Sequence, residues 1–164
     1  MKSSFVFFLL LCGMAECQIR QYIYISEKMN WFSAQRYCRE KYTDLATITT
    51  DAENRRLMNA SSGVISSDSW IGLNRTAPGS ERWQWSDGES PHFFQWLTGQ
   101  PNNFNGIQNC VKVESEGWND YECSASYPFY CSWRFVLVKD RSGKERAGPP
   151  TPPGPCPTVL GDAV

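Results

Sequence analysis

Side-chain oxygens are concentrated in three short stretches between residues 100 and 120. The first stretch is Gln100-Pro101-Asn102, the second contains Gln108, and the third is Trp118-Asn119-Asp120. Amide and carboxylate oxygens are the ligands that hard divalent cations such as Ca²⁺ take from proteins. The three stretches therefore predict a metal-binding site in a polar loop.

Catalytic groups are scarce. Nucleophilic catalysis needs a base beside the nucleophile, and the only histidine, His92, belongs to a Pro91-His92-Phe93 loop. Paired carboxylates can hydrolyse glycosides, and four acidic side chains are available for this, namely Glu114, Glu116, Asp120 and Glu122. Charges so close together in loops are usually solvated. We therefore expect a protein that is not an enzyme.

Two helices are expected to support these loops. Asn30 can cap a helix with one apolar face, which consists of Trp31, Ala34, Tyr37, Cys38 and Tyr42. This face carries Cys38, which is therefore expected to point inward. Thr50 and Glu53 form a capping-box pattern that opens a second helix, through about Asn59.

Short β-favouring runs predict the strands at residues 22–25, 45–48, 70–73, 82–85, 111–113 and 128–133. Residues 88–110 show no regular periodicity, and such a long loop inside a compact domain is usually functional. The simpler interpretation is an irregular surface connection stabilised by Phe93, Phe94 and Trp96.

Residues 1–17 have the organisation of a secretory signal peptide. Lys2 precedes an apolar block at residues 5–11, and small residues follow. Cleavage after Ala15 would retain Cys17, whereas cleavage after Cys17 would begin the mature chain at Gln18. No later stretch approaches about 18 consecutive apolar residues. We expect a secreted, extracellular protein without a membrane span.

The net charge of -1 provides no basic surface, so nucleic acid is not an expected partner. The sequons at Asn59 and Asn74 predict N-glycosylation. The secretory route also allows disulfides. Four cysteines lie in the body of the chain, at positions 38, 110, 123 and 131, and they allow three connectivities.

The composition changes after Trp133. Residues 135–141 repeat the order of residue types in residues 22–28, either because a second domain copy begins there or by coincidence. In both cases we expect residues 139–164 to be a disordered tail, since a Pro- and Gly-rich run buries too little to offset the entropy of ordering. Cys156 in this tail either pairs between chains or stays a free thiol. The expected domain then covers residues 18–138.

From about residue 20 to 134 the chain resembles the C-type lectin-like domain family. The matching segments follow the family's order, with Cys38 upstream of Trp70-Ile71-Gly72-Leu73, Trp83-Gln84-Trp85-Ser86-Asp87-Gly88, Gln100-Pro101-Asn102, Cys110, Trp118-Asn119-Asp120, Cys123 and Cys131. The resemblance implies an α+β fold in which two helices flank short antiparallel strands and one long loop displays the ligand site. It also implies disulfides that join Cys38 to Cys131 and Cys110 to Cys123.

In sugar-binding members of this family, five side chains ligate one Ca²⁺. The matching positions here are Gln100, Asn102, Gln108, Asn119 and Asp120, with Pro101 expected in the cis form. Members with a working site usually present three carboxylates, whereas Asp120 is the only one here. The resemblance therefore implies weak or partly lost calcium binding, because affinity follows ligand charge.

The sugar preference stays open, because Gln-Pro-Asn is neither the mannose-type triplet Glu-Pro-Asn nor the galactose-type Gln-Pro-Asp. The resemblance implies a secreted lectin that binds glycans or glycoproteins through the same five residues. The alternative is a calcium-independent module that binds a protein ligand through aromatic loop residues, namely Phe93, Phe94, Trp96 and Phe104.

Overall fold

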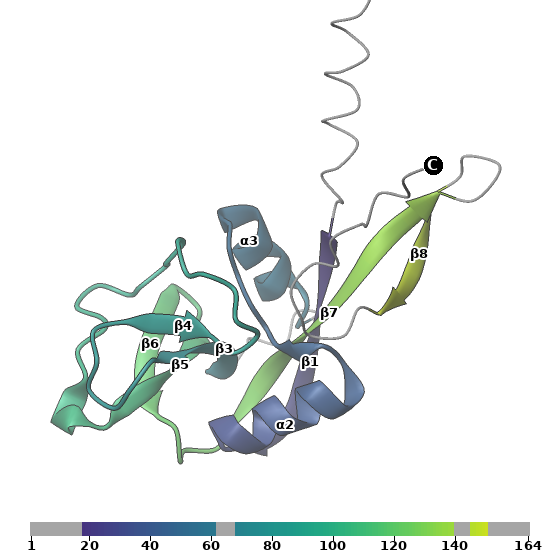
Figure 1. Cartoon of the computed structure of the whole chain (residues 1–164). Helices are drawn as coiled ribbons and strands as arrows, with labels where there is room; N and C mark the ends of the chain where they lie inside the picture. Colours follow the sequence, from purple (N-terminus) through teal and green to yellow (C-terminus); the bar gives the residue numbers. More distant parts are fainter. Residues whose placement is uncertain (1–17, 62–67, 140–144, 151–164) are drawn as a thin grey trace, which may run out of the picture.

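The computed structural model describes residues 18–61, 68–139 and 145–150 (Figure 1). In chain order, the elements are β1 (Gln18–Met29), α2 (Trp31–Lys41), β2 (Asp44–Leu45), α3 (Asp51–Asn59), β3 (Ser69–Arg75), β4 (Trp83–Trp85), the 3₁₀ turn η1 (Phe104–Gly106), β5 (Gln108–Glu114), β6 (Gly117–Glu122), β7 (Tyr127–Lys139) and β8 (Glu145–Pro150). Two helices and a sheet make the predicted α+β architecture. The expected signal peptide and Cys156 lie outside the described residues.

The sheet is built on the pairing of β1 with β7. These strands are antiparallel, with Ile23 opposite Cys131. The sheet continues in the order β1-β7-β3-β5-β6, and β3 meets β7 in parallel at Trp70 and Phe129. Strands β3 to β6 lie to one side of β1 and β7 (Figure 1). Strands β1 and β7 are longer than the short runs expected from the sequence, because their backbones continue to pair with each other outside the apolar segments.

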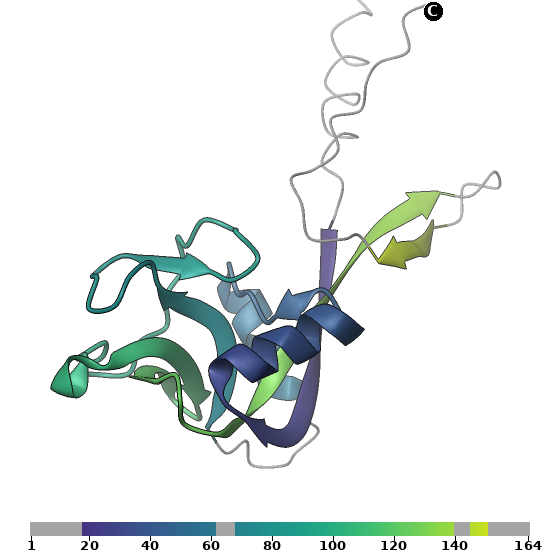
Figure 2. The same ribbon diagram turned by 60° about the horizontal axis from the view of Figure 1, so that its bottom comes forward.

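Helix α2 begins at the predicted cap. The Asn30 side chain accepts the Ser33 N–H at 2.9 Å, and the helix buries Trp31, Ala34 and Cys38. This face packs against β2, β3 and β7. Figure 2 shows α2 lying across β1 and β7. The apolar spacing of the sequence therefore predicted three buried positions of this helix, while Tyr37 is partly buried and Tyr42, also partly buried, lies just after the last helical residue.

Helix α3 has a cap that differs from a capping box. The Thr50 hydroxyl accepts the Glu53 N–H at 3.2 Å, as expected. The Glu53 carboxylate, however, accepts the Thr49 N–H at 2.8 Å, one residue before the cap. Arg20 of β1 also donates to this carboxylate, at 3.3 Å, so Glu53 fastens α3 to the sheet. Within the described residues, neither helix is long and apolar enough to cross a bilayer.

Two disulfides join distant parts of the chain. Cys38 of α2 is bonded to Cys131 of β7, and Cys110 of β5 to Cys123, just after β6. These are the pairs that the resemblance implies. The first closes a separation of 93 residues, which by chain entropy stabilises the fold by about 4 to 5 kcal/mol. The core around them contains the buried rings of Trp70, Trp85, Trp118, Phe129 and Tyr130.

Three segments differ from the expectation. Of the strand expected at residues 45–48, only Leu45 is in a strand, because β2 is limited to Asp44–Leu45. Trp118-Asn119-Asp120, expected in a loop, lies in strand β6, because its backbone pairs with β5 from Val111 to Val113. In the tail, expected to be disordered from residue 139, Lys139 belongs to β7 and Glu145–Pro150 forms β8, which pairs with β7. The backbone pairs offered by β7 therefore order a Pro-containing segment that has little apolar surface of its own. Residues 140–144 and 151–164 lie outside the described part.

Candidate functional site

The long connection between β4 and β5 is fastened to β6. The Leu97 N–H donates to the Trp118 carbonyl at 2.9 Å, and the Trp118 N–H donates to the Gln95 carbonyl at 2.7 Å. A glycine is needed beside this bridge, because a Cβ at Gly117 would lie 2.8 Å from the Gln95 carbonyl oxygen. The Gln100-Pro101 bond is cis, as expected. The connection is therefore a fixed loop.

Asp120 holds the segment that follows Pro101. Its side chain is fully buried, and its two carboxylate oxygens accept the N–H groups of Asn102 and Asn103, at 3.0 and 2.9 Å. One of these oxygens also accepts from the Arg75 guanidinium, at 2.7 Å. The only carboxylate among the five predicted ligands is thus already paired with a cation of the protein.

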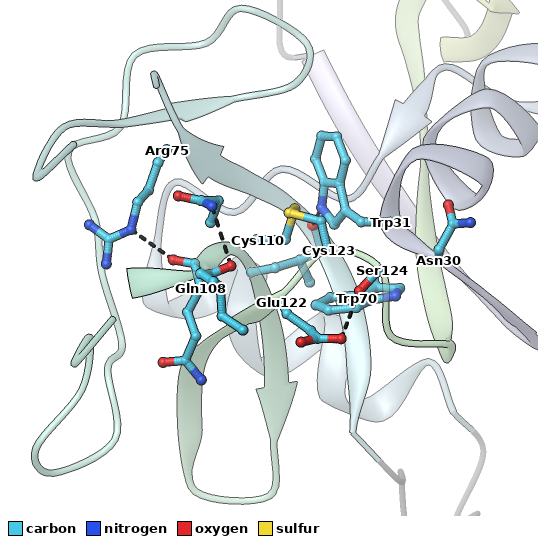
Figure 3. The surroundings of a disulfide bond; sticks show 12 residues. Asn30, Trp31, Trp70, Arg75, Gln108, Cys110, Glu122, Cys123 and Ser124 are labelled. Carbon is cyan, nitrogen blue, oxygen red and sulfur yellow. Dashed lines mark hydrogen bonds between the residues drawn. A yellow bond between two sulfur atoms is a disulfide. The ribbon is translucent and has the colours of Figure 1, made fainter. Parts of the chain in front are cut away.

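Arg75, at the end of β3, is fully engaged. Besides Asp120, its guanidinium donates to the Gln108 carbonyl, at 2.8 Å, and to the Ser80 carbonyl. Figure 3 shows the bond to Gln108. The guanidinium also lies over the Trp83 ring, 4.3 Å from its centroid. This is a favourable cation–π contact, because the face of an indole ring attracts positive charge. The side chain is only 4% exposed, so these contacts replace its hydration.

Two of the predicted ligand oxygens are used inside the loop. The side-chain oxygens of Gln108 and Asn102 both accept the Phe104 N–H, at 2.7 and 3.0 Å. Gln100 differs, because its side-chain oxygen is buried without a hydrogen-bond partner. The structure therefore brings Asn102, Gln108 and Asp120 together around η1.

Asn119 lies apart from that group. Neighbouring side chains of a strand point to opposite faces, so Asn119 points away from Asp120. Its amide donates to Glu114 at 2.9 Å, while its oxygen is buried without a hydrogen-bond partner. Glu114 also pairs with Lys112 at 3.0 Å, so a lysine lies on this face of β6.

These five side chains do not fit a Ca²⁺ ion in this arrangement. The single carboxylate, Asp120, is paired with Arg75, and the amide oxygens of Asn102 and Gln108 accept a backbone N–H. The other two amide oxygens are buried, that of Gln100 in the loop and that of Asn119 on the other face of β6. A cation near Asp120 would also be repelled by the guanidinium. Across the described residues, no group of three or more His, Cys, Asp and Glu side chains could hold a metal ion.

Comparison with known proteins places this arrangement in a family. Residues 27–133 match the family described as Lectin C-type domain, which is more than half of the chain. The chain belongs to the C-type lectin domain family. Such domains are generally not enzymes, which agrees with the scarcity of catalytic groups in the sequence. The Nδ1 atom of His92 lies 3.0 Å from the Ser90 carbonyl oxygen, within hydrogen-bond distance.

Similar C-type lectins are known from snakes and other animals. The chain is 35% identical, over 70% of its length and 77% of the relative's, to a "C-type lectin mannose-binding isoform" of Notechis scutatus scutatus. It is 34% identical, with the same coverage, to a protein of that description from Oxyuranus scutellatus. Among solved structures, human lithostathine has a TM-score of 0.64 at 27% identity, covering 69% of this chain and 90% of that one.

Arg75 and Trp83 were not predicted as site residues. The sequence gives little sign of their role. Trp83 belongs to a motif that indicates the fold, and Arg75 is the middle residue of a sequon, so neither pattern points to a contact with Asp120. Of the aromatic residues proposed for ligand contact, Phe93 packs against Trp118, whereas Phe94 and Phe104 are 40% and 65% exposed. Phe94 stacks on Trp96 with an angle of 12° between the rings. The C-type lectin loop thus presents part of its predicted aromatic set to solvent.

Proposed function

We propose that the protein is a secreted C-type lectin whose long loop binds glycan without calcium. The observation that carries this proposal is the buried ion pair of Arg75 with Asp120. In a calcium-dependent site the metal would join the loop segments and contact the ligand. Here the guanidinium already joins Asp120 to the carbonyls of Gln108 and Ser80. Ligand contact then has to come from the loop surface.

The loop surface has the groups that a sugar requires. Asn102 and Asn105 are exposed, and amide groups both donate hydrogen bonds to hydroxyls and accept them. The exposed rings of Phe94 and Phe104 offer flat apolar faces for the C–H side of a pyranose. Asn103 and Asn105 hold the loop tip with φ of 44° and 56°, a conformation that Asn tolerates. The mannose-binding description of the relative agrees with a glycan ligand.

A glycan array tests this proposal when it is probed in calcium and again in EDTA. We expect the same set of bound glycans in both, because the Arg75 guanidinium already pairs with the Asp120 carboxylate. Phe94→Ala should weaken binding, whereas Phe32→Ala, a control on an exposed ring of α2, should not. Loss of all glycan binding in EDTA would contradict calcium independence. Equal effects of the two variants would contradict the choice of surface.

A protein ligand is the second candidate. It is favoured by the exposure of Phe104 and Ile107, at 65% and 49%, because exposed apolar side chains in one loop are typical of protein interfaces. An array without any bound glycan would favour it. So would saturable binding of a defined extracellular protein that Phe104→Ser abolishes and EDTA leaves unchanged.

A further inference from the structure

A groove of about 550 Å³ lies beside the Cys110–Cys123 disulfide. Phe32 of α2 and Ile107 form apolar parts of its lining, and Glu122 and Ser124 add polar groups. Figure 3 shows Trp31, Glu122 and Ser124 around this disulfide. Phe32 and Ile107 are 60% and 49% exposed, so the groove presents apolar surface to solvent.

Asn74 of β3 points into this groove. It lies opposite Gln84 of β4 and opposite Cys110 of β5, and residues opposite one another in antiparallel strands share a face. All three residues line the groove. Arg75, the next residue, directs its guanidinium to Asp120, on the other face, as the alternation of a strand requires. The groove and the proposed glycan site are therefore on opposite faces of β3.

Asn74 is also the acceptor position of the sequon Asn74-Arg75-Thr76. Its side-chain oxygen is buried without a hydrogen-bond partner. We propose that Asn74 carries an N-linked glycan whose first sugars lie in the groove, against Phe32 and Ile107. This rests on the secretory route of the proposed function, because N-glycosylation of sequons belongs to that route.

The attachment step needs a co-reactant, an oligosaccharide linked to a lipid diphosphate. The Asn74 side-chain nitrogen forms a bond to the anomeric carbon of the first sugar and loses one proton. The bond between that carbon and the diphosphate oxygen breaks, and the lipid diphosphate leaves with the electron pair. No oxidation or reduction occurs.

The groove suits such a sugar better than it suits a charged ligand. The C–H face and acetamido methyl group of the first sugar can cover the two apolar side chains, while Gln84 and Asn109 are within the lining for its hydroxyls. Glu122 adds a carboxylate, and the Arg75 guanidinium brings no positive charge to the groove, because it points to Asp120 on the other face of β3. The other sequon differs, because Asn59 is exposed at the end of α3 and is absent from the groove lining.

The occupancy of Asn74 can be measured on the full chain secreted from cells that glycosylate. Intact mass should show one glycan fewer in Thr76→Ala than in wild type. Thr76→Ser keeps the sequon and should keep the glycan, which makes it the matched control. Thr76 is exposed, and its hydroxyl contacts only the Ser80 hydroxyl among the described residues, at 3.2 Å, so folding should not be affected. A wild-type chain with unmodified Asn74 would overturn the proposal.

The seating of the glycan needs a second readout. A peptide N-glycosidase applied to the folded protein should release the Asn74 glycan several-fold more slowly than the Asn59 glycan, because it has to leave the groove first. Thr76→Ala should bind the apolar dye ANS several-fold more than wild type, since Phe32 and Ile107 lose their cover. Asn59→Gln should leave dye binding unchanged. Equal release rates together with equal dye binding would overturn the seating, whatever the glycan array shows for the loop.

Discussion

Replacing Arg75 by Gln tests the proposed calcium-free site most directly. The substitution keeps a polar side chain but removes the positive charge beside Asp120. Arg75 and Asp120 are 8% and 0% exposed, so water cannot replace the lost partner. Removing one member of a buried ion pair costs about 3 to 5 kcal/mol, because the other charge stays buried and uncompensated. At roughly 4 °C per kcal/mol, Tm should fall by about 12 to 20 °C.

Three control variants separate charge from general damage. Arg75→Lys keeps the charge and loses the fork of donors, and it should cost less than Arg75→Gln. The double variant Arg75→Gln with Asp120→Asn should regain at least about 1 kcal/mol over the single variant, since neither side chain of this pair is then charged. Arg55→Gln breaks an exposed pair with Asp51, whose side chains are 67% and 57% exposed, and it should cost less than about 0.5 kcal/mol. Urea unfolding of all four variants gives these values.

Calcium adds a second measurement. Wild type should gain no Tm in 10 mM calcium. Arg75→Gln should gain about 1.4 kcal/mol if the uncovered Asp120 binds calcium with a Kd of about 1 mM. In that background, Gln108→Glu adds a second carboxylate and should tighten calcium binding several-fold by calorimetry. A wild type that calcium stabilises as much as it stabilises Arg75→Gln would refute the role given to the guanidinium.

Three further predictions concern other parts of the fold. Burial raises the pKa of Glu53, but hydrogen bonds from Thr49 and the charge of Arg20 outweigh burial and lower this pKa below the ordinary 4.5. The Glu53 carboxylate therefore stabilises the fold at higher pH, and this stabilisation is lost as the pH falls through the folded pKa. In urea unfolding between about pH 3 and 6, the free energy of unfolding should fall less with pH for Glu53→Gln than for wild type. Gly117→Ala should cost about 1 to 3 kcal/mol and speed hydrogen exchange at Trp118, because its Cβ meets loop backbone. Truncation after Lys139 removes β8, which pairs with β7, and should lower Tm by less than about 4 °C in differential scanning calorimetry.

The sequence predicted the elements whose signals are local. Asn30 and Thr50 cap the two helices, and both caps use side chains within three residues of the groups they bond. Strand β6 was missed for the opposite reason. Asn119 and Asp120 favour loops by residue type, and their strand depends on pairing with β5. The Glu53 carboxylate bonds the Thr49 N–H and Arg20, a choice that depends on where β1 passes.

The sequence motif names oxygen-bearing side chains for the candidate site but gives no sign of the guanidinium that pairs with Asp120. A motif comparison finds Gln100, Asn102, Gln108 and Asp120 because each occupies a family position. Arg75 contacts Asp120 across 45 positions of the chain, and nothing in its neighbourhood indicates that pairing. The low carboxylate count predicts weak calcium binding, and the structure adds that the one carboxylate is paired with Arg75, a side chain outside the motif. Ion pairs between residues so far apart in the chain can be identified only from the folded structure.

The pairing of β1 with β7 decides how the domain can be tethered. Gln18 lies opposite Val136, so the two ends of the lectin domain leave it side by side. In both views the long connection between β4 and β5 lies on the other side of the molecule (Figures 1 and 2). A support or a second domain joined at either end therefore leaves the loop accessible. Copies linked through their ends would raise one another's effective concentration at a multivalent surface, so avidity could compensate for a weak single contact.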